Sequence, residues 1–187
     1  MADQKQARKQ PKKKVLKQDY LKNAGAYYLQ RYASSEENFK KVLWRKARRR
    51  QWPDDLTEDQ VRQWIDDTCE TFVRLGVLND SQYVETKLRS LRRSGRSSSY
   101  IRNYLRSKGV EQSLIEDALG TEEDGDADWR AAVAFARRRR LGPFRLPDAP
   151  LSRDDEQRQL AAFARAGHRY DLAQRILATK EKDELLE

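Results

Sequence analysis

The chain has 187 residues, with 39 Lys and Arg against 30 Asp and Glu, and a formal net charge of +9. Charged residues make up 37% of the sequence and equal the hydrophobic share of 37%, which excludes a membrane protein and a single large apolar core. No apolar segment follows the N-terminal lysines, and Cys69 is the one cysteine. We therefore expect a cytoplasmic protein without a disulfide.

Residues 1–18 carry much of the excess positive charge, because they hold seven Lys and Arg and a single acid, Asp3. The segment has few apolar side chains to bury, so it is predicted to be a disordered basic tail. Such a tail either binds phosphate groups or keeps the chain in solution.

From residue 19 onward, apolar residues recur at helical spacing. The clearest stripe runs through residues 57–75 and predicts an amphipathic helix in which Cys69 is a buried structural thiol. No alternating pattern predicts a strand, so the expected fold class is all-α. In chain order, the predicted helices cover residues 19–33, 35–48, 57–75, 80–93, 97–109, 111–119, 127–141, 153–166 and 169–178.

Two parts of the chain repeat one another around Gly109 and Gly167, which lie 58 residues apart. Each glycine follows a predicted helix and is itself followed by leucines at the fifth and tenth positions. Residues 20–76 have a similar outline of three helices. Because a three-helix unit of about 50 residues buries little surface alone, we expect tandem three-helix repeats stacked into an elongated, curved array.

Composition divides the chain into six expected segments. They are a disordered basic tail (1–18), three-helix repeat one (19–79), three-helix repeat two (80–120), an acidic linker (121–128), three-helix repeat three (129–180) and a charged C-terminal tail (181–187).

Patterns for catalysis and metal binding are not found in the sequence. The one histidine, His168, has no cysteine or second histidine to complete a metal site, and it is predicted to be a packed or half-exposed structural residue. The glycines are scattered singly, so no loop is suited to cradling phosphates. We expect no enzymatic activity, no cofactor and no metal, although the many carboxylates keep a weak hydrolase among the alternatives.

Arginines gather in groups, three of which lie near the ends of predicted helices, where positive charge complements the helix dipole. Four consecutive arginines exceed that need, and the planar guanidinium group binds carboxylates and phosphates. The groups therefore predict binding to an acidic protein surface or to a nucleic-acid backbone. The predicted partner-binding residues are Arg92, Arg93, Arg96, Arg102, Arg106, Lys108, Arg137, Arg138, Arg139 and Arg140.

Three segments in the middle of the chain resemble the central motif of the RecX family of regulatory proteins. They are Gly76-Val-Leu-Asn-Asp-Ser-Gln-Tyr83, Arg92-Arg-Ser-Gly95 and Ile101-Arg-Asn-Tyr-Leu-Arg-Ser-Lys-Gly-Val110. Residues 137–144 and 163–172 resemble the third unit of that family, and residues 28–43 resemble the first. The chain departs from the family pattern at three packing or turn positions, Val84, Ser97 and His168.

The resemblance implies tandem three-helix units and a non-enzymatic regulator of the RecA recombinase. Members of this family lie in the helical groove of the RecA–DNA filament, limit its extension, and suppress its ATPase, strand-exchange and co-protease activities in recombination and the SOS response. The implied partner is the RecA filament, bound by a monomer of this chain. The alternative is a helical DNA-binding protein that contacts the phosphates of single- or double-stranded DNA through its basic clusters and N-terminal tail.

Overall fold

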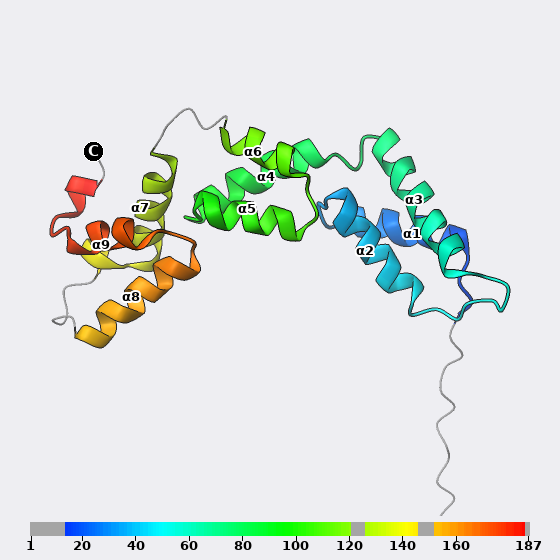
Figure 1. Ribbon diagram of the computed structural model, residues 1–187, viewed down its shortest axis with the longest axis horizontal. Coiled ribbons are helices and arrows are strands. Elements are labelled where there is room, and N and C mark those ends of the chain that lie inside the picture. The colour runs from blue at the N-terminus through cyan, green and yellow to red at the C-terminus, as the bar shows by residue number, and fades with distance from the viewer. Residues whose placement is uncertain (1–13, 121–125, 146–151, 186–187) are drawn as a thin grey trace, which may run out of the picture. The chain divides into compact units, whose positions relative to one another are not determined.

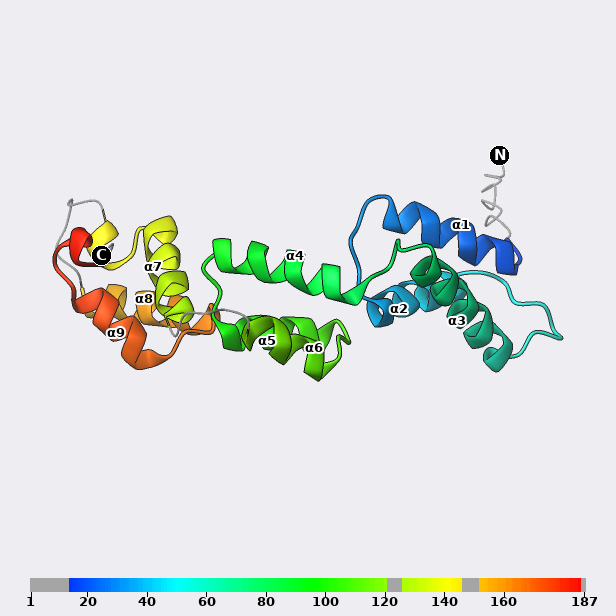
Figure 2. The ribbon, with the colours of Figure 1, turned by 90° about the horizontal axis from the view of Figure 1, so that it is seen from above.

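The computed structural model describes residues 14–120, 126–145 and 152–185 (Figures 1 and 2). These residues are helical, which confirms the all-α prediction, and their only extended pairing is an isolated bridge between Val15 and Gln51. None of their helices is long and apolar enough to cross a membrane. The helices are α1 (Gln18–Leu29), α2 (Glu36–Ala47), α3 (Glu58–Arg74), α4 (Asp80–Arg93), α5 (Ser98–Ser107), α6 (Gln112–Gly120), α7 (Ala127–Arg139), α8 (Arg153–Arg165) and α9 (Tyr170–Ala178), with short 3-10 helices η1 (Gly142–Phe144) and η2 (Lys182–Leu185).

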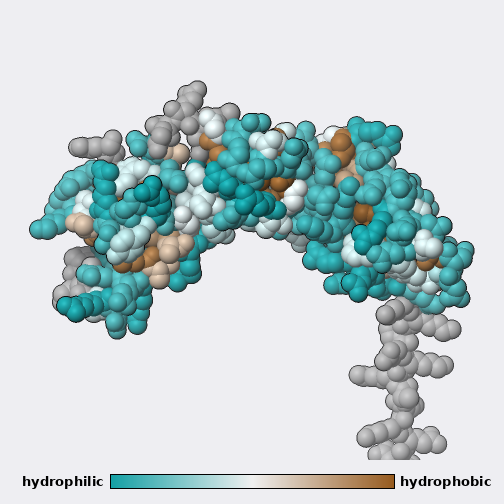
Figure 3. All heavy atoms as spheres, viewed as in Figure 1, coloured by the Kyte–Doolittle hydropathy of each residue, from teal (hydrophilic) through white to brown (hydrophobic). Residues whose placement is uncertain are grey.

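The chain divides into two compact units, residues 1–78 and 79–187. Unit one contains α1, α2 and α3, and unit two contains the remaining helices. On the face drawn in Figure 3, hydrophilic side chains predominate in both units, and hydrophobic side chains appear only as small patches. The apolar side chains are instead gathered in the cores of the helix triplets.

Unit one packs its three helices around one apolar core. The rings of Phe39 on α2 and Phe72 on α3 meet edge to face, with centroids 5.6 Å apart. Thr57 begins α3 through a capping box with Gln60, as its position before the apolar stripe predicts. The buried members of this core are Leu16, Leu21, Phe39, Leu43, Ala47, Val61, Ile65, Cys69 and Leu78.

The predicted stripe of α3 is buried except at its end. Cys69 is 1% exposed, and burial raises the pKa of its thiol to about 11, as suits a structural rather than a reactive cysteine. Val73 is 37% exposed. The first helix ends at Leu29, earlier than predicted, and leaves Tyr27 and Tyr32 more than half exposed.

The predicted basic tail is too long at its C-terminal end. Leu16 is 1% exposed in the core of unit one, and its N–H donates to the carbonyl of Gln51 at 2.8 Å. Gln51 in turn donates to the carbonyl of Lys14. Leu16 and these two backbone hydrogen bonds therefore hold residues 14–16 against unit one, and residues 1–13 lie outside the described residues.

Two other predicted boundaries also differ from the structure. The linker expected at 121–128 is too long, because Ala127 already begins α7, while residues 121–125 lie outside the described residues. The charged tail expected at 181–187 contains η2, whose Leu185 is 7% exposed in the core formed by α7, α8 and α9. Here again a single leucine anchors a charged segment; residues 186–187 lie outside the described residues.

Unit two contains two helix triplets, each with its own apolar core. The α4–α6 triplet buries Tyr83, Val84, Ile101, Leu105, Val110 and Ile115. The α7–α9 triplet buries Ala132, Val133, Phe135, Ala136, Phe163, Ala166, Ala173, Ile176 and Leu185. In both triplets the last two helices are separated by a glycine with positive φ, Gly109 or Gly167, at the positions where the sequence repeats itself.

Candidate functional site

The two triplets of unit two meet at a junction formed by the end of α4, the start of α5, helix α7 and the turn between α8 and α9. α4 contacts α7, and the N–H of Ser97 donates to the carbonyl of Ala166 at 3.2 Å. A Cβ added to Gly167 would stand 2.4 Å from Oγ of Ser97. The backbones are therefore in close contact, and the junction sets the positions of several predicted arginines.

Arg92 lies inside this junction. Its Nη1 donates to Oδ1 of Asp128 at 2.6 Å and its Nη2 donates to Oγ of Ser98 at 2.6 Å, while its side chain is 14% exposed. Asp128 also accepts the backbone N–H of Ser98 at 2.7 Å. The guanidinium group predicted to contact a partner therefore joins α4, the start of α5 and the start of α7.

The charge on Asp128 is maintained by these contacts. Burial raises the pKa of its carboxyl, but hydrogen bonds from the backbone and hydroxyl of Ser98 and from Arg92 outweigh that effect, so the pKa lies below its ordinary value. The ion pair consequently persists at neutral pH.

His168 is packed in the same junction, in agreement with its predicted structural role. Its ring packs against both Phe135 and Phe163, with centroid distances of 5.8 and 5.7 Å, and it is 6% exposed. Nε2 lies 2.8 Å from the carbonyl oxygen of Gly95, and Nδ1 has no hydrogen-bond partner among the described residues. Burial lowers the pKa of the imidazole, which favours its neutral form.

A cationic groove, here called the junction groove, opens beside these contacts. The guanidinium of Arg96 stacks on Tyr100, 4.2 Å from the ring centroid, and Nη1 of Arg96 donates to the carbonyl of Arg165 at 3.1 Å. No acidic side chain is among the described residues that line it. Those residues are Ser94, Arg96, Tyr100, Phe135, Arg138, Arg139, Ala162 and Arg165.

The other predicted residues lie outside this groove. Arg102 donates two hydrogen bonds to Glu116, at 2.8 and 3.0 Å, and Arg106 donates to Gln112. The ammonium of Lys108 lies over the ring of Tyr104. Among the remaining arginines, Arg137 lines a separate groove beside Trp129, and Arg93 and Arg140 are exposed.

Two charged contributors to the site were not predicted from the sequence, Arg165 and Asp128. Arg165 occupies the repeat position that Ser107 occupies before Gly109, so the repeat pattern does not single out an arginine there. Asp128 was assigned to a linker, and nothing local distinguishes it from neighbouring acids, because its partner Arg92 lies 36 residues earlier. Within the described parts of the chain, no group of His, Cys, Asp and Glu is arranged for a metal ion.

Comparison with known proteins identifies the family. A family model described as the second three-helix domain of RecX matches residues 79–119. Over 176 residues the chain is 34% identical to regulatory protein RecX of Myxococcus xanthus, covering 94% of this chain and 93% of that protein. The chain belongs to the RecX family. Regulatory protein RecX of Agrobacterium fabrum is 30% identical over 169 residues, 89% of this chain and 88% of that protein.

Solved RecX structures share the fold. RecX from Lactobacillus salivarius matches with a TM-score of 0.56 at 19% identity, covering 90% of this chain and 96% of that one. The resemblance seen in the sequence is thus confirmed, and RecX membership makes the chain a non-enzymatic regulatory protein. RecX membership also implies RecA as the protein that it regulates.

Proposed function

We propose that this RecX protein binds the RecA–DNA filament in its groove and inhibits filament extension, ATPase, strand exchange and co-protease activity. The observation that carries the proposal is the junction groove, which brings Arg96, Arg138, Arg139 and Arg165 together with no acidic side chain among the described residues that line it. Guanidinium groups bind carboxylates in fixed geometry, so this groove suits an acidic surface of a partner protein. We also propose that the protein acts in the cytoplasm as a monomer.

The construction of the junction supports this function. Arg92 and Asp128 fasten α4 to α7, and the ring of Phe135 packs against His168. Because these contacts fix the groove walls before binding, little ordering entropy is lost when a partner docks. A protein that binds one state of a filament better than another shifts the balance between assembly and disassembly.

The predicted residues then fall into two roles. Arg96, Arg138 and Arg139 line the groove and are proposed to contact the filament. Arg92 is proposed to act indirectly, by positioning α7. The other exposed or partly exposed cations predicted from the sequence are proposed to extend the contact; they are Arg93, Arg102, Arg106, Lys108, Arg137 and Arg140.

DNA binding is the second candidate function, and the same groove favours it, since a phosphate backbone also seeks cations free of acidic neighbours. The two candidates differ in their salt dependence. In a phosphate-dominated complex, a plot of the logarithm of the binding constant against the logarithm of the salt concentration should have a slope of about −0.9 for each duplex phosphate contacted. A filament-specific complex should need RecA and retain binding at salt concentrations that release the chain from naked DNA.

Co-sedimentation with RecA filaments on single-stranded DNA tests the proposal. The variant Arg138→Glu/Arg139→Glu should bind at least tenfold more weakly than the wild type, because it reverses two charges in the groove. The control Arg153→Glu/Lys180→Glu makes the same change of net charge at exposed positions outside the groove and should bind as the wild type. Equal weakening by both variants, or by neither, would contradict the role of the groove.

A further inference from the structure

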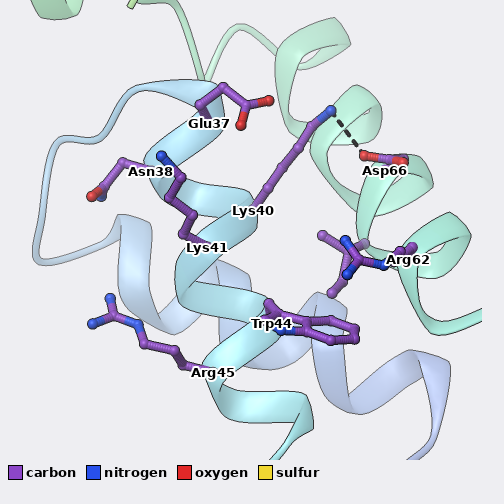
Figure 4. Close-up of a pocket in the computed structure, with 9 residues that line it drawn as sticks. Glu37, Asn38, Lys40, Lys41, Trp44, Arg45, Arg62 and Asp66 are labelled. Carbon is purple, nitrogen blue, oxygen red and sulfur yellow. Dashed lines mark ion pairs between the residues drawn. The ribbon is translucent and has the colours of Figure 1, made fainter. Parts of the chain in front are cut away.

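Unit one has a groove of its own between α2 and α3 (Figure 4). Its apolar part is formed by Trp44 and by Ile65, which is 4% exposed. The residues that line it are Glu37, Asn38, Lys40, Lys41, Trp44, Arg45, Arg62, Ile65 and Asp66. Four of these are cationic and two are acidic, so the groove is net positive without being uniformly so.

Two of the cations are used to hold the walls together. Nζ of Lys40 lies 2.8 Å from Oδ1 of Asp66, and this ion pair joins α2 to α3, as Figure 4 shows. The guanidinium of Arg62 lies over Trp44, 4.5 Å from the ring centroid, and donates to Glu58 at 2.6 Å. The groove is therefore preformed, with the aromatic ring of Trp44 held by a cation.

The other two cations, Lys41 and Arg45, are available to a partner. They stand four residues apart on α2 and so share one face of the helix, and both are exposed. Neither makes a hydrogen bond or ion pair with the parts of the chain that the structure describes. In Figure 4 both extend from the side of α2 that faces away from α3 and from the Lys40–Asp66 pair, so they lie on the outer edge of the groove.

This combination fits a protein segment better than a nucleic acid. Duplex DNA carries a negative charge about every 1.7 Å of its axis, so its backbone would also meet Glu37 and Asp66. A protein segment can instead place a carboxylate at Lys41 and Arg45 and one apolar side chain over Trp44. Tryptophan and arginine are enriched among the residues that dominate protein interfaces.

We propose that the α2–α3 groove binds an acidic protein segment with one apolar anchor side chain, presented by the RecA filament. This inference rests on the proposed function and adds a contact in unit one to the one proposed for unit two. Two linked contacts on one polymer raise the apparent affinity above that of either alone, because the second binding event is intramolecular.

Two variants with equal charge changes test the inference. Lys41→Glu/Arg45→Glu reverses the groove cations, and Arg48→Glu/Arg49→Glu reverses two exposed cations just beyond the end of α2, outside the groove lining. Binding of each to RecA filaments and to a naked DNA duplex is measured, with circular dichroism to verify helicity. We expect the groove variant to bind filaments about tenfold more weakly than the control variant, while both bind the duplex equally.

The outcomes separate the two proposals. If the groove variant and its control bind filaments equally, the inference that the α2–α3 groove contacts the filament is wrong. The proposed function of the whole chain is then unaffected. A groove variant that loses duplex binding more than its control assigns the groove to nucleic acid and also overturns the inference. A wild-type chain that does not bind RecA filaments overturns both proposals.

Discussion

Gly95 lies directly against Phe135, and a Cβ added to this glycine would stand 2.6 Å from Cβ of Phe135 and 2.7 Å from its Cα. The same glycine has φ of +76°, a conformation that other residues adopt only with strain. Its carbonyl faces Nε2 of His168. Gly95 therefore lets the end of α4 approach α7 closely enough for the junction to form.

Gly95→Ala should accordingly destabilise unit two. Left-handed backbone strain of about 1–2 kcal/mol adds to an overpacking cost of about 1–3 kcal/mol. Urea denaturation followed by circular dichroism measures the loss. Gly120→Ala is the matched control, because nothing lies within 4 Å of its added Cβ, and alanine at the last residue of α6 should leave the stability unchanged or raise it slightly. Equal stability of the two variants would show that the junction tolerates a side chain at position 95.

Asp128→Ala should cost about 2 kcal/mol of unfolding free energy at neutral pH, because it leaves the largely buried guanidinium of Arg92 without its charged acceptor. The exposed pair of Arg89 and Glu85, 3.8 Å apart, provides the comparison. Glu85→Ala should change the unfolding free energy by less than about 0.5 kcal/mol. Denaturant titration of both variants measures the contrast, and similar small losses would refute a structural role for the Arg92–Asp128 pair.

The burial of His168 predicts a dependence of stability on pH. Its pKa is lower in the folded chain than the ordinary value of about 6.5, so the folded state disfavours the proton. The contribution of neutral His168 to the unfolding free energy is therefore complete above about pH 6.5. It is lost as the pH falls towards the lowered pKa of the folded chain. His168→Phe preserves an aromatic ring packed against Phe135 and Phe163 and should remove this slope between about pH 5 and 7. An unchanged slope in thermal melts would assign it to another group.

Arg140 follows the last residue of α7 and caps the helix with φ of +55°, and no other described non-glycine residue has positive φ. Arg140→Gly should raise the unfolding free energy by about 0.5–1 kcal/mol, since glycine adopts this conformation without strain. Arg137→Gly is the counterpart, because the same substitution within the helix should lower it by about 1 kcal/mol. Thermal denaturation compares the two, and a loss of stability in Arg140→Gly would contradict the expected relief of strain.

Local sequence pattern predicted the helices well, because each buries a stripe with regular spacing. In α3, for example, Val61, Ile65 and Cys69 are all buried as predicted. The ends of the packed regions were harder to predict, since Leu16 and Leu185 each lie in a charged segment and pack into a core that other helices form.

The sequence predicted which type of residue forms the site, arginine, but not what each arginine does there. Composition singled out Arg92 and Arg138 alike, yet one is committed to Asp128 and the other lines an open groove. Sequence alone does not separate these roles, because the acceptor lies on another helix triplet. Arg165 on α8 likewise lines the groove only because the two helix triplets of unit two pack together.

The most direct test of the central claim is the rate of RecA ATP hydrolysis on single-stranded DNA, titrated with the purified wild-type chain. The account predicts inhibition at ratios well below one chain per RecA subunit, since a chain that bridges a filament affects more subunits than it contacts. An unchanged rate at every ratio up to excess chain would contradict the claim that this protein restrains the RecA filament.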